Sequence, residues 1–397
     1  MTGMLPAAPL LLEVVRERDE LRALAPEWEA LADSLPLRLP FHSPSWHLRW
    51  FDSFAQSRQA VRDSLEVRVL RRTSGELLAV APMMLTERPS VGPLRIRMLQ
   101  FTGADPNLTE VRGVICRPAD ERDVFRTLLG ALRRESDRWD LLQWSGLRAG
   151  GEGEALVLAE RGAEPGLERP DYLLALPASW DAFRGGLSRN IKESLRKCQN
   201  APRRDGVELR GEVIAGAPGL EPALERLYAM HAARAQVETG VHHGDVFSQT
   251  AARRFFTGLA RELAAKGAFR VYQLRHGDKV VAARAAFLLG DTSYLYYSGY
   301  DLDYSRYSVM TSCVAFAIRH AIESGLATVN LSTGNDVSKT RWGPRELIFR
   351  EALWVSPGAH GGLARRAHRL LETARTSQAL HASPLGRLLA LGARRND

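Results

Sequence analysis

A polar segment from Asp301 to Thr311 has the residue types of an anion-binding loop. It follows an aromatic stretch with strand character and opens directly into a helix that we predict from residue 309 to 324. Small or hydroxyl side chains at Ser305, Ser308 and Thr311 would let backbone N–H groups approach a pyrophosphate, and the helix N-terminus favours negative charge. Arg306 adds a cation. The pattern predicts a site for a CoA- or nucleotide-type ligand, or simply a helix capped by Ser308.

A second polar loop follows the strand predicted for residues 328–333 and contains Gly334, Asn335, Asp336, Lys339 and Trp342. Residues at the carboxyl ends of strands face the ligand crevice in open α/β sheets, so this loop should line the same pocket. Arginine is the usual cation of this chain, which makes Lys339 distinctive. A lysine is a compact donor to a phosphate or a developing oxyanion. The alternative is an ordinary surface lysine.

A CoA-type ligand would donate an acyl group, and acyl transfer to an amine requires a group that accepts a proton. The candidates are Asp301 at a strand end and a Gly-flanked loop that contains Glu238, His242, His243 and Asp245. The two adjacent histidines suggest a metal, but neighbouring side chains point in different directions and no third ligand has a recognisable spacing. We therefore expect no metal. The chain also lacks the Gly-x-Ser-x-Gly motif of a serine hydrolase.

The order of predicted elements repeats along the chain. The first copy has strands at 65–71, 77–85, 96–102 and 110–116, a helix at 120–135 and a strand at 139–146. The second has strands at 269–274, 280–289 and 293–300, the helix at 309–324 and a strand at 327–334. Helices are also expected at 180–200 and 220–237. We predict a domain at 1–150, a Gly- and Glu-rich linker at 151–170, a domain at 171–356 and a helical tail at 357–397.

Composition places the chain among globular proteins, with 45% hydrophobic and 25% charged residues in a total of 397. We expect no membrane span and no secretion signal, and a cytoplasmic location. The net charge is +8. Basic residues concentrate between Arg184 and Arg210, where Arg189, Lys192 and Arg196 would share a helix face. That face either binds phosphates or is merely solvated.

Several short motifs, taken together, resemble the CelD/BcsL-like acetyltransferases of the GNAT superfamily. They are Phe41-His-Ser-Pro-Ser-Trp46 with Trp50-Phe51, Trp180-Asp181, Leu187-Ser188-Arg189-Asn190, His231-x-x-Arg234, Tyr296-Tyr-Ser-Gly-Tyr-Asp301, Tyr304-Ser-Arg-Tyr-Ser308, and Gly334 with Lys339 and Trp342. The resemblance covers roughly residues 40–355. In layout the family is similar to the FemABX peptidyltransferases, which carry two GNAT-like halves. The resemblance implies an α/β fold of tandem GNAT-like domains with mixed sheets flanked by helices.

The resemblance further implies transfer of an acetyl or longer acyl group from acyl-CoA, with no metal, to a small-molecule or sugar amine. Such activity is often associated with exopolysaccharide or cell-envelope biosynthesis. The pyrophosphate-binding residues would be Tyr304, Ser305, Arg306, Tyr307, Ser308, Val309 and Thr311. Substrate binding is expected at Arg234, Tyr297, Gly334 and Trp342, and catalysis at Asp301, Lys339, His242 and Glu238. The first half would be a degenerate copy.

Two other functions fit the same sequence. The donor could be an aminoacyl-tRNA, as in the FemABX proteins, which the basic segment 184–210 would suit. Otherwise nucleic acid is not expected as a partner. The family commonly has Pro-Gly where this chain has Val309-Met310, so a non-catalytic interaction protein is the third possibility.

Overall fold

The computed structural model describes residues 10–89, 95–105, 107–236 and 244–376. The elements of the first half are β1 (Leu11–Val15), α1 (Arg18–Asp33), α2 (Pro44–Phe54), β2 (Ser57–Arg58), β3 (Val61–Leu65), β4 (Val67–Arg71), β5 (Leu77–Ala81), β6 (Met83–Arg88), β7 (Ile96–Phe101), β8 (Ile115–Cys116), α3 (Glu121–Arg134), β9 (Leu141–Arg148), α4 (Glu152–Leu158) and β10 (Ala163–Ala175). A 3₁₀ turn, η1 (Pro40–His42), precedes α2.

The second half contains α5 (Trp180–Gly186), α6 (Arg189–Arg204), β11 (Arg210–Ala215), α7 (Leu220–Ala235), η2 (Val246–Ser248), α8 (Thr250–Ala265), β12 (Phe269–His276), β13 (Lys279–Leu289), β14 (Thr292–Tyr300), η3 (Leu302–Tyr307), α9 (Val309–Glu323), β15 (Thr328–Thr333), α10 (Val337–Thr340), β16 (Arg345–Val355) and α11 (Ala359–Thr376). None of the helices in the described residues is long and apolar enough to cross a membrane.

The predicted repeat is confirmed. In each half a strand and two helices precede an antiparallel meander, and a helix then connects two parallel strands. The parallel pairs are β7 with β9, connected through α3, and β14 with β15, connected through α9. A parallel pair needs such a crossover, because a tight turn reverses the chain direction and can only join antiparallel strands.

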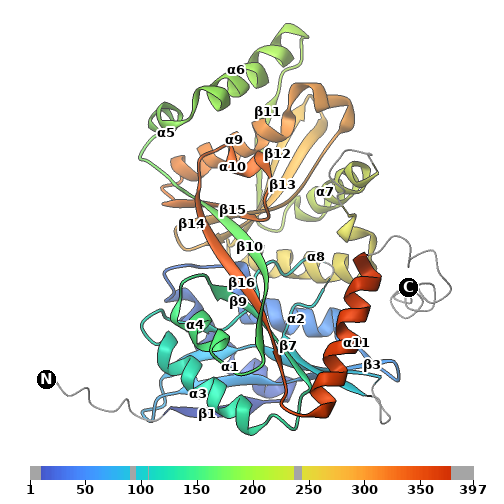
Figure 1. The fold of residues 1–397 in the computed structure, drawn as a ribbon. Coiled ribbons are helices and arrows are strands. Elements are labelled where there is room, and N and C mark those ends of the chain that lie inside the picture. Colours follow the sequence, from blue (N-terminus) through green and yellow to red (C-terminus); the bar gives the residue numbers. More distant parts are fainter. Residues whose placement is uncertain (1–9, 90–94, 106, 237–243, 377–397) are drawn as a thin grey trace, which may run out of the picture.

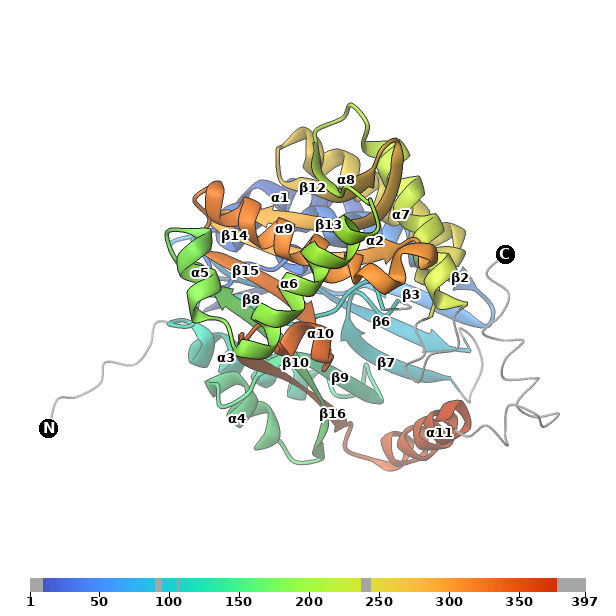
Figure 2. The ribbon, with the colours of Figure 1, turned by 90° about the horizontal axis from the view of Figure 1, so that it is seen from above.

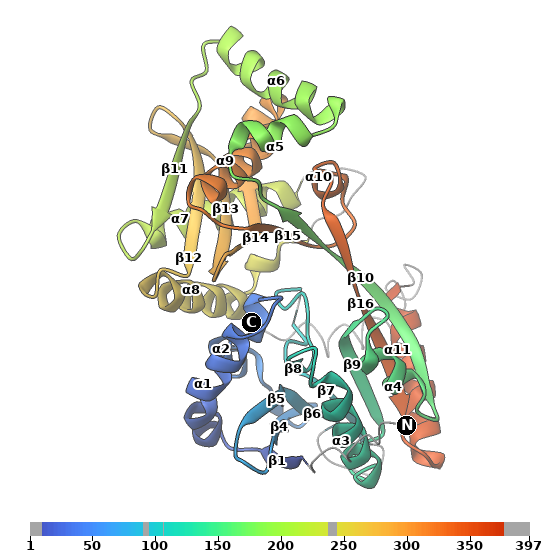
Figure 3. The same cartoon turned by 90° about the vertical axis from the view of Figure 1, so that its left-hand side faces the viewer.

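One sheet of twelve strands runs through both halves in the order β11-β12-β13-β14-β15-β10-β16-β9-β7-β6-β3-β2. The long antiparallel strands β10 and β16 link the two halves, and both can be followed from one half into the other in Figures 1 and 3. A second sheet has the order β1-β4-β5-β8. Residues 151–170, expected to be a linker, instead contain α4 and much of β10.

Several predicted boundaries differ from the structure. The first hairpin divides at Glu66 and Pro82, so that β4 and β5 pair in the small sheet while β3 and β6 pair in the large one. Proline has no N–H for a continuous ladder, which favours a break at this point. The strand expected at 110–116 is limited to β8, and the helix expected at 180–200 consists of α5 and α6.

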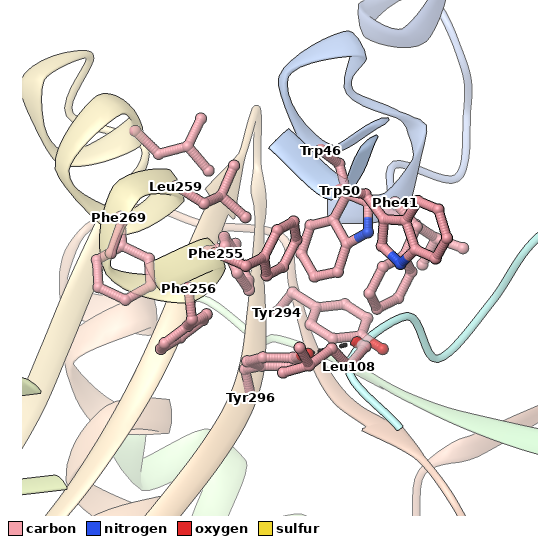
Figure 4. Packing of buried hydrophobic residues seen from close by; sticks show 14 of the residues in the cluster. Phe41, Trp46, Trp50, Leu108, Phe255, Phe256, Leu259, Phe269, Tyr294 and Tyr296 are labelled. Carbon is pink, nitrogen blue, oxygen red and sulfur yellow. Dashed lines mark hydrogen bonds between the residues drawn. The ribbon is translucent and has the colours of Figure 1, made fainter. Parts of the chain in front are cut away.

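Aromatic side chains join the halves. Helix α2 packs on α8, and the Trp46 ring lies 5.0 Å from that of Phe255 and 6.3 Å from that of Tyr296. Figure 4 shows these rings in one buried cluster together with Trp50 and Tyr294. Edge-to-face aromatic pairs add about 0.5–1.5 kcal/mol each beyond the burial of their surface. The tryptophan-rich motif of the first half is therefore an interface between the halves.

Candidate active site

The strands β14 and β15 separate part-way along their length. Their parallel pairing covers only Thr292↔Thr328, Ser293↔Val329 and Tyr294↔Asn330, although β14 continues to Tyr300 and β15 to Thr333. The sheet thus opens into a wedge on the carboxyl side of Asn330. An opening at the carboxyl ends of parallel strands is the usual place for a ligand in α/β proteins.

A segment of the first half, residues 107–110, lies along one side of this wedge. The hydroxyl of Tyr297 donates to the carbonyl of Asn107 at 2.7 Å, and the hydroxyl of Tyr296 donates to the carbonyl of Leu108. Figure 4 shows Tyr296 directed at Leu108. The next contact is a hydrogen bond to an acidic side chain: the hydroxyl of Tyr294 donates to the carboxylate of Glu110. The first half therefore supplies a carboxylate to the wedge of the second.

The tryptophan helix α2 anchors this segment. Asp105 accepts hydrogen bonds from Trp50 Nε1 at 3.0 Å and from the backbone N–H of Leu108 at 2.6 Å. Thr109 donates to the same carboxylate at 2.6 Å and accepts from Trp46 Nε1 at 3.0 Å. Because every one of these donors is held by packing, Glu110 is presented from a fixed backbone rather than from a free loop.

Glu110, Lys339 and Asp171 form the charged centre of the wedge. Burial raises the pKa of Glu110, and the Lys339 charge and the hydrogen bond from Tyr294 oppose that rise. Burial lowers the pKa of Lys339, while Glu110 opposes that fall. Asp171 is fully buried, and burial raises its pKa to about 7. Two carboxyls and one lysine with pKa values displaced toward neutrality are the groups expected of acid–base chemistry.

The backbone at the end of β15 is distorted to hold Lys339. Ser332 has φ of +66°, which is rare for a residue other than glycine. Its N–H is held by Asn330 Oδ1 at 2.7 Å, and Asn330 Nδ2 donates to Asp171 at 2.8 Å. Lys339 Nζ donates to Ser332 Oγ at 2.9 Å and to the carbonyl of Thr333. Strain of this kind is often found at functional sites.

A β-bulge lies next to the wedge on the other side of β14. The register passes from Ala286↔Leu295 to Arg284↔Ser298, so Tyr296 and Tyr297 together oppose one residue. Arg284 spans the bulge and donates to the carbonyl of Tyr296 at 3.4 Å and to Ser298 Oγ at 3.2 Å. Bulges break the ladder locally and are enriched beside active sites.

The predicted anion loop forms η3 and the start of α9. Ser308 has φ of +52° and makes no side-chain capping hydrogen bond, so the predicted capping role is not observed. Arg306 stacks 4.7 Å from the ring centre of Tyr307 and has a largely exposed side chain. Asp301 is engaged at the loop's start: it pairs with Lys279 at 2.6 Å and accepts from the N–H of Asp303 at 3.0 Å.

The other predicted residues lie in different places. Gly334 adjoins Lys339, and Tyr297 borders the wedge. Arg234, at the end of α7, interacts electrostatically with Arg284 and Asp336. Trp342 is buried against Phe183, with ring centres 6.4 Å apart, which is a packing role. Glu238, His242 and His243 lie outside the described residues. Within the described ranges no group of three or more His, Cys, Asp or Glu residues could hold a metal ion.

Sequence reasoning missed Glu110, Asp171, Asn330 and Arg284. Glu110 was placed in a strand, and its partners Tyr294 and Thr333 are 184 and 223 positions away. A spacing of that length has no periodic signature. Asp171 carried a usable signal, since an aspartate directly before the apolar run that starts at Tyr172 predicts a buried carboxyl.

Replacing Asp171 with asparagine is expected to raise stability at high pH. The carboxyl has a pKa near 3.8 in its ordinary state and about 7 when folded. Between these values the folded state binds more protons than the unfolded state, so stability falls as pH rises. The variant lacks this fall. Its unfolding free energy relative to the parent should grow by about 3 kcal/mol from pH 5 to pH 8, measured by urea titration.

Glu154→Gln is the matched control. Burial opposes ionisation of Glu154, but hydrogen bonds from Arg350 and from the N–H of Gly150 hold its pKa below the ordinary value. This carboxylate stabilises the fold above its unfolded pKa, so its replacement should cost nearly the same at pH 5 and pH 8. A stability difference for Asp171→Asn that does not change with pH would contradict a buried carboxyl with a raised pKa.

Part of the second half is similar to a known protein family. Residues 188–340 match the family described as an acetyltransferase (GNAT) domain. The fold is a tandem of GNAT-like halves. No curated protein matches the chain in sequence. The matched region contains the wedge strands, the anion loop and Lys339, whereas Glu110 and Asp171 lie outside it.

Three solved structures are similar to the chain, and FemX supports the same fold. FemX superposes with a TM-score of 0.58 at 11% identity, covering 91% of this chain and 100% of its own. The C-terminal domain of a putative lysylphosphatidylglycerol synthetase from Agrobacterium fabrum has a TM-score of 0.48 at 13% identity over 89% of this chain and 97% of its own. A tandem GNAT protein from the clavulanic acid pathway has 0.44 at 11% identity, over 88% and 100%. The likeness to FemX extends the GNAT-like layout to both halves.

Proposed function

We propose that the protein is an acyl-CoA-dependent N-acyltransferase, and that the wedge between β14 and β15 holds the reacting groups. The observation that carries this proposal is the cluster of the half-buried Glu110 and Lys339 with the buried Asp171, at the point where the two strands diverge. The match to a GNAT acetyltransferase domain over residues 188–340 supports the same reaction class.

The residues of the wedge suit each step of acyl transfer. An amine acceptor enters as an ammonium ion, and the Glu110 carboxylate takes its proton, helped by burial that raises the pKa of this carboxyl. The neutral amine attacks the thioester carbonyl, and Lys339 donates to the oxygen that becomes negative. The C–S bond then breaks, and the second proton of the attacking nitrogen passes to the departing CoA thiolate, so that the amide and the free CoA thiol leave while Glu110 returns its proton to solvent. We assign the base to Glu110 rather than Asp301, because Lys279 already pairs with Asp301.

The CoA diphosphate is assigned to η3 and the first turn of α9. The Ser308 side chain is not used for capping, and the first N–H groups of any helix lack partners within it. Arg306 is the exposed cation of this loop. The residues involved are Tyr304, Ser305, Arg306, Tyr307, Ser308, Val309 and Thr311. Proximity to the wedge follows from β14, which runs from Tyr294 directly into this loop.

The acceptor is proposed to be a small-molecule or sugar amine, with Arg234, Tyr297 and Gly334 beside it. We propose exopolysaccharide or cell-envelope biosynthesis in the cytoplasm as the setting of this reaction, and the resemblance to CelD/BcsL-like acetyltransferases supports the kind of pathway. The first half would serve as the acceptor side. Its own strands support that division, since β6 and β7 pair from Met83↔Phe101 to Arg88↔Ile96 without a bulge, unlike β13 and β14.

Calorimetric titration with acetyl-CoA and with free CoA tests the cofactor assignment. We expect saturable binding by the parent, and at least about tenfold weaker binding by Arg306→Glu, because the substitution replaces an attraction for phosphate with a repulsion. Arg226→Glu, on the exposed face of α7, is the matched charge reversal and should bind like the parent. Equal affinity in all three proteins would exclude the η3 loop as the diphosphate site.

An aminoacyl-tRNA donor is the second candidate, favoured by the surface of α5 and α6. Arg184, Lys192 and Arg196 line a shallow hollow of about 300 Å³ there. RNA phosphates would suit this surface, and binding should then weaken steeply with salt. Salt-sensitive tRNA binding without any response to CoA would select this donor. If neither ligand shifts the thermal midpoint, the non-catalytic function remains.

A further inference from the structure

Helix α11 attaches to the protein by its smallest residues. Gly361 and Ala364 are buried against the region of β16 and β9, whereas Leu363 is 62% exposed and Leu370 is 72% exposed. A side chain at Gly361 would collide with the backbone of Ser356, so glycine is what permits the close approach. Surface helices ordinarily turn their leucines toward the core. The two leucines of α11 whose side chains the structure describes, Leu363 and Leu370, do the reverse.

The exposed leucines form one stripe. Leu363 and Leu370 are seven residues apart, or about two helical turns, and therefore lie on the same side of α11. Ala367 lies between them, and the exposed Arg366 flanks the stripe. Arg365 and Arg369 lie toward the body and pair with Glu164. In Figure 2 the helix lies at the periphery of the molecule, far from α6.

The C-terminal part of the sequence, which includes α11, contains most of the net positive charge of the chain. Residues 359–397 contain seven arginines against Glu372 and Asp397, a net of +5 out of the +8 of the whole chain. The first 358 residues thus contribute only +3. An exposed leucine stripe flanked by arginine, in a region of high positive charge, has the chemistry of an interfacial helix on an anionic bilayer.

We propose that α11 docks the protein on a membrane surface containing anionic lipids, with Leu363 and Leu370 inserted among the acyl chains and Arg366 at the headgroups. The charge selects this occupant over a second copy of the chain, because pairing two such helices would bring like charges together. The proposed attachment is peripheral, because the exposed leucines lie on one side of α11 while its opposite side packs on the protein. The proposal is independent of the acyltransferase assignment.

Co-sedimentation of the full chain with vesicles tests it. We expect binding to phosphatidylcholine vesicles that contain about a third phosphatidylglycerol, and little binding to phosphatidylcholine alone. Leu363→Ser/Leu370→Ser should weaken the partition at least about tenfold, and Arg366→Ala about fivefold. The control pair Leu11→Ser/Leu158→Ser changes exposed leucines on β1 and α4 and should bind like the parent.

Three results would overturn the proposal. The first is no binding of the parent to anionic vesicles, and the second is unchanged binding by Leu363→Ser/Leu370→Ser with its thermal midpoint intact. The third is a concentration-dependent dimer of the parent, seen by sedimentation velocity without lipid and abolished by the same substitutions. That result would assign the leucine stripe to a second copy of the chain.

Discussion

Lys339→Met is expected to lower kcat/KM for acyl transfer by about 10²–10³-fold, the usual cost of one donor to a developing oxyanion. Methionine keeps an unbranched side chain one atom shorter than that of lysine but cannot donate to Ser332 Oγ, the carbonyl of Thr333 or the reacting oxygen. Release of the CoA thiol in the presence of an amine acceptor measures the rate. The loss should lie mainly in kcat, because the interaction strengthens only in the transition state.

Two further variants distinguish catalysis from structure. Lys339→Arg should not restore activity, since the planar guanidinium does not fit a position shaped for a compact ammonium. Lys279→Met removes an exposed lysine paired with Asp301 and should retain most of the rate. Full activity in Lys339→Met would remove the lysine from the mechanism. An equal loss of kcat/KM in Lys279→Met would instead indicate that Asp301 takes part in the reaction.

Glu110→Gln is expected to reduce kcat/KM by about 10²–10⁴-fold, the range associated with general base catalysis. Glutamine can still accept the hydrogen bonds from Tyr294 and from the N–H of Thr333, so the position should remain folded. What it lacks is the capacity to take a proton. Because burial raises the pKa of Glu110, the parent should lose activity as pH falls through that pKa, and the variant should lack this acidic limb.

Glu154→Gln serves as the control for removing a buried carboxylate. Glu154 is 6% exposed and pairs with Arg350 at 2.8 Å, away from the wedge. Its replacement should lower the thermal midpoint and leave the pH profile of kcat/KM unchanged. An acidic limb that persists in Glu110→Gln would assign the base to another group, with Asp171 as the next candidate.

Most of the local structure could be predicted from sequence, because it follows from short-range patterns. Alternating apolar residues and the turn at Gly277 specify the hairpin of β12 and β13, and the apolar periodicity of 309–324 specifies α9. Lys339 could also be singled out from the sequence as a candidate site residue, since lysine is rare in this chain. Its partners could not, because they depend on how the two halves meet.

The long-range pairing has no counterpart in local pattern. Residues 163–170 contain Pro165, Gly166 and several charges and belong to the predicted linker, yet they form the first part of β10, which pairs with β16. Tertiary context overrides propensity there, since strand preference depends largely on neighbours. The same limit hid Glu110: the pattern predicts a strand at 110–116, but the backbone of Gly113 packs against Ser145 and Gly146 and the segment is irregular.

The exchange of strands at the centre of the large sheet affects how the protein can be made. β9, from the first half, pairs with β16, whose last residue is Val355. During translation the edge of β9 therefore has no partner until more than two hundred further residues have left the ribosome. Exposed edges of this kind favour association with other chains. The first half cannot complete its sheet alone, and shelter of that edge by a chaperone would protect the nascent protein from aggregation.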